Sequence, residues 1–240
     1  MKMDRRRFIK ICAGSTAALA LGVPRVWASE DYKEFENALL TDTSGSPIKA
    51  SNLGSEEAYI FHYPYKGLPC FLINLGKASA INLPLAGDPL VEGNSTYNWP
   101  GGVGKGSNLV AYVAICTHQI SSPNKDVSYM RYAASGSKLA GGPGKIVCCA
   151  HGTIFDPAEG AKPVFGPATY PLLPIRLEYN SSEDSLMATG MAGHHLVDQY
   201  FKSYKRDLIK EFGPGVYREG VGSSTTTLLL SQYSASVPAC

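Results

Sequence analysis

The most informative segment of the sequence is Cys148-Cys149-Ala150-His151-Gly152-Thr153-Ile154-Phe155-Asp156. A second segment, Cys116-Thr117-His118, precedes it, with Cys116 standing 32 residues before Cys148. The two patterns, Cys-x-His and Cys-x-x-His, supply two thiolates and two imidazoles, which are common metal ligands. The four residues alone leave two alternatives open. One is a structural zinc site with all four donors on one ion, and the other is an iron–sulfur cluster in which His replaces Cys on one of two irons.

Each ligand pair follows a segment typical of a β-strand. Residues 109–115 are apolar and lead into Cys116, and residues 145–147 lead into Cys148 after a Gly/Pro loop. We therefore expect both ligand pairs on loops at strand ends. The same pattern predicts a hairpin of residues 58–62 and 70–75, and a closing hairpin of residues 172–179 and 186–189.

The composition agrees with a β-rich fold. The chain has 240 residues, of which 44% are hydrophobic and 18% charged, with 25 Gly, 16 Pro and 14 Tyr. Short strands and many turns are favoured over a helical bundle, so we predict an all-β, mainly antiparallel fold with one core domain and extensions. A net charge of +2 gives no argument for a nucleic-acid partner, and we expect none.

Four segments outside this core carry weaker patterns. Residues 195–212 place apolar side chains on one helical face before Gly213, which predicts one amphipathic helix. Residues 223–233 are predicted as a last strand, and residues 34–40 as a short helix or an edge strand. Residues 124–144 form a long insertion between the ligand pairs, which we expect to be a solvated loop or else part of a partner surface.

The first residues have the features of an export signal. Asp4-Arg5-Arg6-Arg7-Phe8-Ile9-Lys10 resembles the twin-arginine motif, and an apolar stretch at residues 11–23 leads to Val26-Trp27-Ala28. We therefore expect a signal peptide over residues 1–28, cleavage after Ala28 and a periplasmic location. The alternative is an uncleaved membrane anchor, although the apolar stretch is short compared with the roughly 17–25 residues that a spanning helix needs.

Three segments together resemble the Rieske family of iron–sulfur proteins. They are the Cys-x-His pair, the second box with its Gly, hydroxyl, aromatic and Asp residues after His151, and Phe165-Gly166-Pro167-Ala168, which resembles the proline loop of the family. The resemblance covers residues 109–190 and implies a Rieske-like antiparallel β-sandwich with a small cluster-binding subdomain, followed by a C-terminal helix and tail. It also implies one [2Fe–2S] cluster, with a buried iron on the Cys pair and an outer iron on the His pair.

The resemblance assigns roles to particular residues. The implied cluster ligands are Cys116, His118, Cys148 and His151, and the implied surrounding residues are Gly152, Thr153, Phe155, Gly166 and Pro167. The hydroxyl of Thr153 is implied to bond a cluster sulfide, whereas Phe155 replaces a Tyr whose hydroxyl bonds a ligand sulfur. Fewer hydrogen bonds to sulfur stabilise the reduced cluster less, so we expect a potential in the lower part of the family range of about −150 to +300 mV.

The remaining cysteines depart from the family pattern. Ser121 and Ala150 stand where family members of bc complexes carry a bridging Cys pair, so that disulfide cannot form. Cys149 lies one position earlier, so it is either an inert small side chain, which we favour, or bonded to another cysteine. An oxidising compartment would permit a bond between Cys70 and Cys240.

The segments divide the chain into five predicted parts. They are the signal peptide (1–28), the N-terminal β part of the base domain (29–108), the cluster-binding region (109–170), the closing hairpin of the base domain (171–190) and the C-terminal helix and tail (191–240).

The resemblance and the signal together imply an exported electron-transfer protein. The leading hypothesis is the iron–sulfur subunit of a bc-type quinol–cytochrome c oxidoreductase, with a cytochrome of type b or c as redox partner and quinol as electron donor. The alternative is the small Rieske subunit of a periplasmic, arsenite-oxidase-like enzyme, bound to a large catalytic subunit. A zinc-stabilised binding module is a third hypothesis. In each case we identify no catalytic residue and no substrate pocket in the sequence, so any enzyme activity belongs to the assembly.

Overall fold

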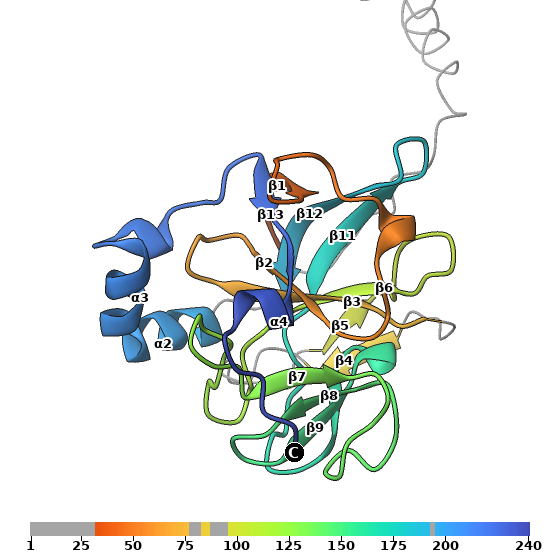
Figure 1. The fold of residues 1–240 in the computed structure, drawn as a ribbon, viewed down its shortest axis with the longest axis vertical. Helices are drawn as coiled ribbons and strands as arrows, with labels where there is room; N and C mark the ends of the chain where they lie inside the picture. The colour runs from red at the N-terminus through yellow and green to blue at the C-terminus, as the bar shows by residue number, and fades with distance from the viewer. Residues whose placement is uncertain (1–31, 77–82, 87–95, 193–194) are drawn as a thin grey trace, which may run out of the picture.

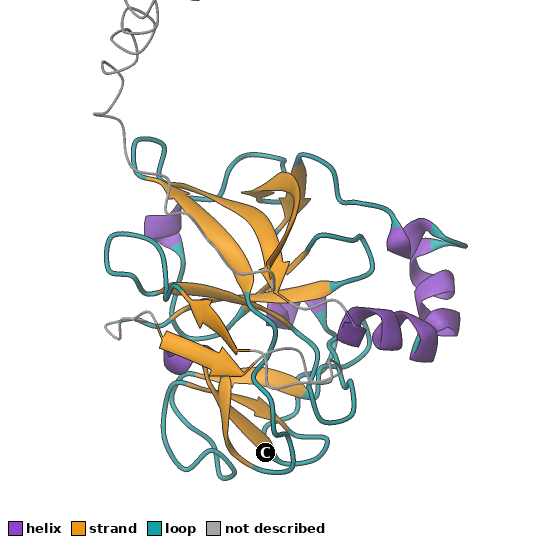
Figure 2. Cartoon of the chain, turned by 180° about the vertical axis from the view of Figure 1, so that it is seen from behind, coloured by secondary structure: helices purple, strands orange, loops and turns teal. Residues whose placement is uncertain are grey.

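The computed structural model describes residues 32–76, 83–86, 96–192 and 195–240. Strands make up the body of this part, and its two longest helices lie together on one side (Figure 2). The predicted all-β class is therefore confirmed. The predicted export signal lies outside the described residues. Among the helices that are described, none is both long enough and apolar enough to span a membrane.

The middle layer of the fold is an antiparallel sheet with the strand order β14-β2-β3-β6. Its strands are β14 (Leu228–Leu229), β2 (Tyr59–His62), β3 (Pro69–Asn74) and β6 (Leu109–Val113). The predicted hairpin of residues 58–75 corresponds to β2 and β3. Side chains of β3 alternate between two cores, because Leu72 faces one core and Phe71 and Ile73 face the other. Both faces of β3 are thus buried, which explains its continuous apolar run.

One core lies between the middle sheet and a sheet with the order β11-β12-β1-β13 (Figure 1). Its strands are β11 (Ile175–Asn180), β12 (Ser185–Ala192), β1 (Tyr32–Thr41) and β13 (Ser224–Thr226). The two sheets form the predicted sandwich, and β11 and β12 are the closing hairpin. Of the two expectations for residues 34–40, the strand is correct, but it is not an edge strand along its whole length, because residues 39–41 also pair with β13. Here β1 is interior, because β12 pairs with it antiparallel on one side and β13 pairs with it in parallel on the other.

The other core lies between the middle sheet and a third sheet with the order β10-β9-β8-β7 (Figure 1). Its strands are β10 (Lys162–Phe165), β9 (Thr153–Asp156), β8 (Lys145–Cys148) and β7 (Met130–Ala133). Strand β7 belongs to the insertion of residues 124–144, so the expectation of a solvated loop is wrong at this point. Met130 and Tyr132 are buried because β7 pairs with β8 and packs on this core. A separate antiparallel pair is formed by β4 (Leu83–Ala86) and β5 (Thr96–Trp99).

The predicted helix of residues 195–212 is in fact two helices, α2 (His195–Ser203) and α3 (Lys205–Phe212). Tyr204 separates them with φ −99° and ψ 16°. Apolar residues of both helices, including Phe201 and Leu208, pack on the sandwich core, and the bend lets both apolar faces reach it. Helix α3 ends immediately before Gly213, as the sequence predicts.

The predicted single strand of residues 223–233 is wrong. Strand β13 pairs with β1 in the outer sheet, β14 pairs with β2 in the middle sheet, and α4 (Leu230–Tyr233) follows. The chain crosses from the outer sheet to the middle sheet at Thr227, which divides the predicted strand in two. Short 3₁₀ helices complete the described elements: η1 (Ala50–Asn52), η2 (Pro157–Glu159) and η3 (Val216–Arg218). The division of the chain into five parts stays a prediction.

Candidate metal centre

The two predicted Cys ligands meet in the interior of the protein. Cys116 follows the end of β6 and Cys148 is the last residue of β8, and both are fully buried. Their thiols share a hydrogen bond, which raises the pKa of Cys116, as burial also does. The same bond lowers the pKa of Cys148 to about 7, although burial acts in the opposite direction. A bound cation would favour the loss of both protons, since thiolates rather than thiols are metal ligands.

The loop after Cys116 points backbone donors at its sulfur. The N–H group of Ile120 donates to the carbonyl of Cys116 at 2.9 Å, and the N–H group of Cys116 donates to the carbonyl of Ser121 at 2.8 Å. This tight loop aims the N–H groups of His118 and Gln119 at the Cys116 sulfur, where they favour the thiolate. A short turn is therefore enough to surround the Cys116 thiolate with backbone N–H donors.

The second loop repeats this arrangement around Cys148. The N–H group of Gly152 donates to the carbonyl of Cys148 at 2.9 Å and closes the turn. The N–H groups of His151 and Ala150 then face the Cys148 sulfur, and the hydroxyl of Ser121 also donates to it. Sequence reasoning treated Ser121 only as a missing bridging Cys and overlooked this donor. A hydroxyl residue at that position was the available signal.

The two predicted His ligands form a second pair. The ring centroids of His118 and His151 are 5.0 Å apart, with an interplanar angle of 82°. His151 is exposed and His118 is half-buried. The Nδ1 atom of His118 is buried and has no hydrogen-bond partner among the described residues. A buried nitrogen without a partner is rare, and a metal ion is one way to satisfy it.

The donors fit a two-iron cluster. The four predicted ligands form a thiol pair joined by a hydrogen bond and an imidazole pair with neighbouring rings, which is the division of a Rieske cluster, with two Cys on one iron and two His on the other. In the described part of the chain, no three His, Cys, Asp or Glu side chains are placed around a single ion. The hydroxyl oxygen of Thr153 is buried without a partner among the described residues. Its position therefore fits the predicted bond to a cluster sulfide.

The predicted proline loop lies directly on the second box. Gly166 has φ +95°, and a Cβ atom added there would lie 2.5 Å from the carbonyl oxygen of Gly152 and 2.6 Å from the Cα atom of Thr153. Only glycine allows this approach. Phe165 pairs with Ile154 in the β9–β10 ladder, yet 63% of Phe165 is exposed. The loop thus covers the second box from one side and presents an apolar side chain to solvent.

Phe155 occupies its predicted place without contributing a polar group. Its side chain is fully buried and packs in the core under the third sheet. The adjacent Asp156 accepts a hydrogen bond from Lys145 and a second one from the N–H group of Ala158 at 3.0 Å. These bonds fix the end of β9, so the second box is held between two anchored strands.

The favoured expectation for Cys149 is wrong, and the alternative, that it is bonded to another cysteine, is correct. Cys149 is not an inert thiol, because it forms a disulfide with Cys240 across a Cα–Cα distance of 5.8 Å. Cys70 is therefore not bonded to Cys240, and its buried thiol is free. Burial raises the pKa of Cys70, which keeps it protonated and unreactive. The pairing could not be deduced from the sequence because Cys149 and Cys240 are separated by 91 residues.

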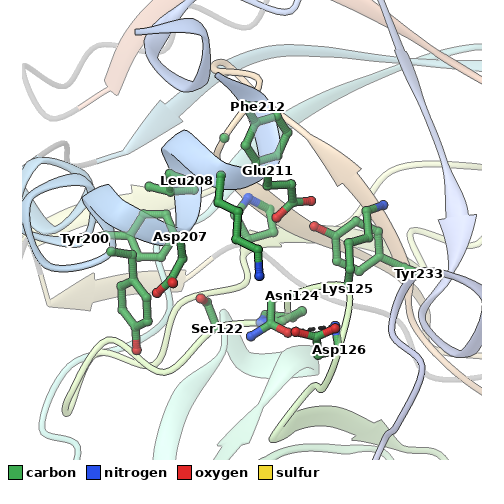
Figure 3. Close-up of a pocket in the computed structure, with 15 residues that line it drawn as sticks. Ser122, Asn124, Lys125, Asp126, Tyr200, Asp207, Leu208, Glu211, Phe212 and Tyr233 are labelled. Carbon is green, nitrogen blue, oxygen red and sulfur yellow. Dashed lines mark hydrogen bonds between the residues drawn. The ribbon is translucent and has the colours of Figure 1, made fainter. Parts of the chain in front are cut away.

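A cavity of about 380 Å³ lies beside the first ligand loop (Figure 3). It is bounded by residues 122–126, by α2 and α3, and by Tyr233. None of the four predicted ligands lines it. Its walls come from segments far apart in the sequence, so no local pattern predicts it.

These features define an all-β protein with a paired thiol–imidazole centre on two loops. No family model matches the chain. Among solved structures, the chain is similar to the soluble domain of the Rieske protein II (soxF) from Sulfolobus acidocaldarius, with 26% sequence identity and a TM-score of 0.47 over 65% of this chain and 78% of that one.

Proposed function

We propose that this chain is a Rieske-type electron-transfer protein that carries one [2Fe–2S] cluster on Cys116, His118, Cys148 and His151. The observation that supports it best is the pairing of the donors, with two buried thiols in contact and two imidazoles in contact at the outer side. A zinc-stabilised binding module is less well supported. Zinc requires all four donors around one ion, whereas here the thiols and the imidazoles form two separate pairs.

The residues of the site would have different roles in such a centre. The bound cluster supplies a one-electron couple. Cys116 and Cys148 hold it in the dry interior, and the N–H groups directed at their sulfurs stabilise the thiolate charge. The exposed edge of His151 is the route to a partner. Gly166 brings the proline loop onto the second box, which keeps water away from the sulfur side.

We further propose that the protein is exported and serves as the iron–sulfur subunit of a bc-type quinol–cytochrome c oxidoreductase, with a cytochrome of type b or c as its redox partner. The twin-arginine motif of residues 4–10 supports export, and the Cys149–Cys240 disulfide is of the kind that persists in oxidising compartments. Exposed apolar side chains beside the second box, Phe165 at 63% and Val164 at 48%, suit a partner surface.

The alternative is the small subunit of a periplasmic, arsenite-oxidase-like enzyme. The helix pair α2–α3 beside the first ligand loop favours it, since that pair offers a docking surface for a large catalytic subunit. Purification from its native membrane and soluble fractions distinguishes the two. A bc-type subunit is expected with cytochromes, and the alternative with one large subunit.

The cofactor is tested on the purified protein by iron and labile-sulfide analysis, visible absorption and EPR after reduction with dithionite. We expect two irons and two sulfides per chain and the EPR signal of a His-ligated cluster. A colourless protein that contains only zinc would refute the proposal.

Two variants separate ligation from burial. Cys148→Ser removes a proposed ligand and is expected to abolish iron and sulfide binding. Cys70→Ser is the matched control, because Cys70 is equally buried and also free, but its side chain belongs to the sandwich core and not to the core that contains Cys116 and Cys148. Equal cluster content in both variants would show that Cys148 is not a ligand.

A further inference from the structure

We propose that the C-terminal tail, residues 234–240, is a clamp that positions the second ligand loop, residues 148–152. The inference rests on the proposed function, because that function makes Cys148 and His151 cluster ligands. Its physical basis is a disulfide placed directly beside a ligand. Cys149 stands between Cys148 and Ala150, and its sulfur is bonded to Cys240, the last residue of the chain.

The tail is fixed to the insertion before it reaches the ligand loop. Its backbone N–H groups at Ala235 and Ser236 donate to the carbonyls of Lys125 and Asp126 at 2.8 and 3.1 Å. The N–H group of Ser128 donates back to the carbonyl of Ser236 at 2.9 Å. These bonds form a short parallel contact that holds the tail in register. The disulfide therefore joins the ligand loop to an anchored segment rather than to a free end.

The insertion holds the same point of the ligand loop from the other side. The N–H group of Cys149 donates to the carbonyl of Tyr129 at 2.7 Å, and the N–H group of Leu139 donates to the carbonyl of Cys240 at 3.4 Å. Cys149 is thus fixed both by its backbone and by its side chain. Because Ser121 and Ala150 cannot bridge the two ligand loops, the second loop is covalently tied to the tail instead.

The clamp acts on the cluster through the donors that follow Cys149. The N–H groups of Ala150 and His151 face the Cys148 sulfur, and their direction depends on the backbone at Cys149. Hydrogen bonds to ligand sulfurs set the reduction potential of an iron–sulfur cluster. Release of the tail is therefore expected to change the potential and the electronic structure of the centre, while all four ligands remain in place.

The test compares the holoprotein with Cys240→Ser and with the double variant Cys149→Ser/Cys240→Ser, which leaves no unpaired thiol at the place of the disulfide. Cys70→Ala is the control for a general loss of stability, because it alters the core at β3 and leaves the tail untouched. The measurements are the midpoint potential, the g values of the reduced cluster, and the amide hydrogen exchange of residues 149–152. In both disulfide variants we expect a shifted potential, altered g values and exchange that is faster by about tenfold or more.

Several outcomes separate the clamp from simpler roles. A lower unfolding temperature with unchanged potential, g values and exchange would show that the disulfide only stabilises the fold, and would overturn the inference. The same shifts in Cys70→Ala would overturn it as well. If the wild-type protein binds no cluster, the proposed function fails, and hydrogen exchange alone decides the clamp. Faster exchange at residues 149–152 then supports it, and unchanged exchange refutes it.

Discussion

Replacement of Gly166 by Ala is expected to destabilise the protein by about 2–5 kcal/mol. At φ +95° an L-residue costs about 1–2 kcal/mol relative to glycine. The added methyl group would also lie 2.5 Å from the Gly152 oxygen and 2.6 Å from the Thr153 Cα atom. Both are backbone atoms and cannot rotate away. Separation of the proline loop from the second box therefore adds about 1–3 kcal/mol, the usual cost of overpacking.

The prediction is measured by urea unfolding and by the rate of iron release from the holoprotein at a fixed temperature. Gly45→Ala is the matched control, since Gly45 has φ +82° but a Cβ atom there meets nothing within 4 Å. We expect Gly45→Ala to lose only the backbone contribution of about 1–2 kcal/mol and to release iron at the wild-type rate. Equal losses of stability in the two variants, or equal rates of iron release, would refute the packing of Gly166 on the second box.

Three further predictions follow from buried or constrained groups. Burial, with a smaller contribution from Lys125, lowers the pKa of His62 from 6.5 to about 4, so the unfolded chain binds this proton at a higher pH than the folded protein. Stability is therefore expected to fall by up to about 3 kcal/mol as the pH drops from 6.5 to 4, and a His62→Gln variant should show a flatter dependence of the urea midpoint on pH. Cys240→Ser opens a loop with a sequence separation of 91 residues and is expected to cost about 2–4 kcal/mol in urea unfolding, whereas a reductant should lower the wild type to the same value and leave the variant unchanged. Asp156→Ala leaves the partly buried Lys145 without its carboxylate and is expected to cost about 2–3 kcal/mol, with a smaller additional loss when Lys145→Ala is combined with it in a double-mutant cycle.

The position of each Cys–His pair on one loop after a strand could be predicted because everything that places the pair is local. Cys116 and His118 share one tight loop, and Cys148 and His151 share another, so short spacing and a preceding strand were enough. The approach of the two loops to each other is not local. It became predictable only because the residues after His151 resemble a known box, and the contact between the thiols agrees with that resemblance.

Most errors in the predicted fold involve pairing with another segment of the chain, which is distant in the sequence for β1 and nearer for β7. Strand β1 was expected at an edge because its parallel neighbour β13 lies near the opposite end of the sequence. Strand β7 was expected as a loop because four residues are too few to show a clear strand pattern. Its residues are buried because the strand pairs with β8. The disulfide partner of Cys149 was missed for the same reason. Local propensity carries no information about a pairing strand more than a hundred residues further along the chain, as β13 is from β1. The same holds for a disulfide partner at a sequence separation of 91.

The covalent link that holds the second ligand loop differs from the disulfide of bc-complex Rieske proteins, although the four predicted ligands match the family pattern. The geometry explains why. The ligand set consists of four side chains and is supported by the N–H groups of two short turns. These groups meet only if each of them keeps its position in the sequence. A covalent link to the loop requires only a firmly held Cys within disulfide distance of it. Here the anchored tail supplies it through Cys240, whereas Ser121 donates a hydrogen bond to Cys148 instead of forming a bridge. The two changes act on the same sulfur environment, so a Ser121→Ala variant is expected to shift the potential of the centre in addition to, and separately from, the effect of opening the disulfide.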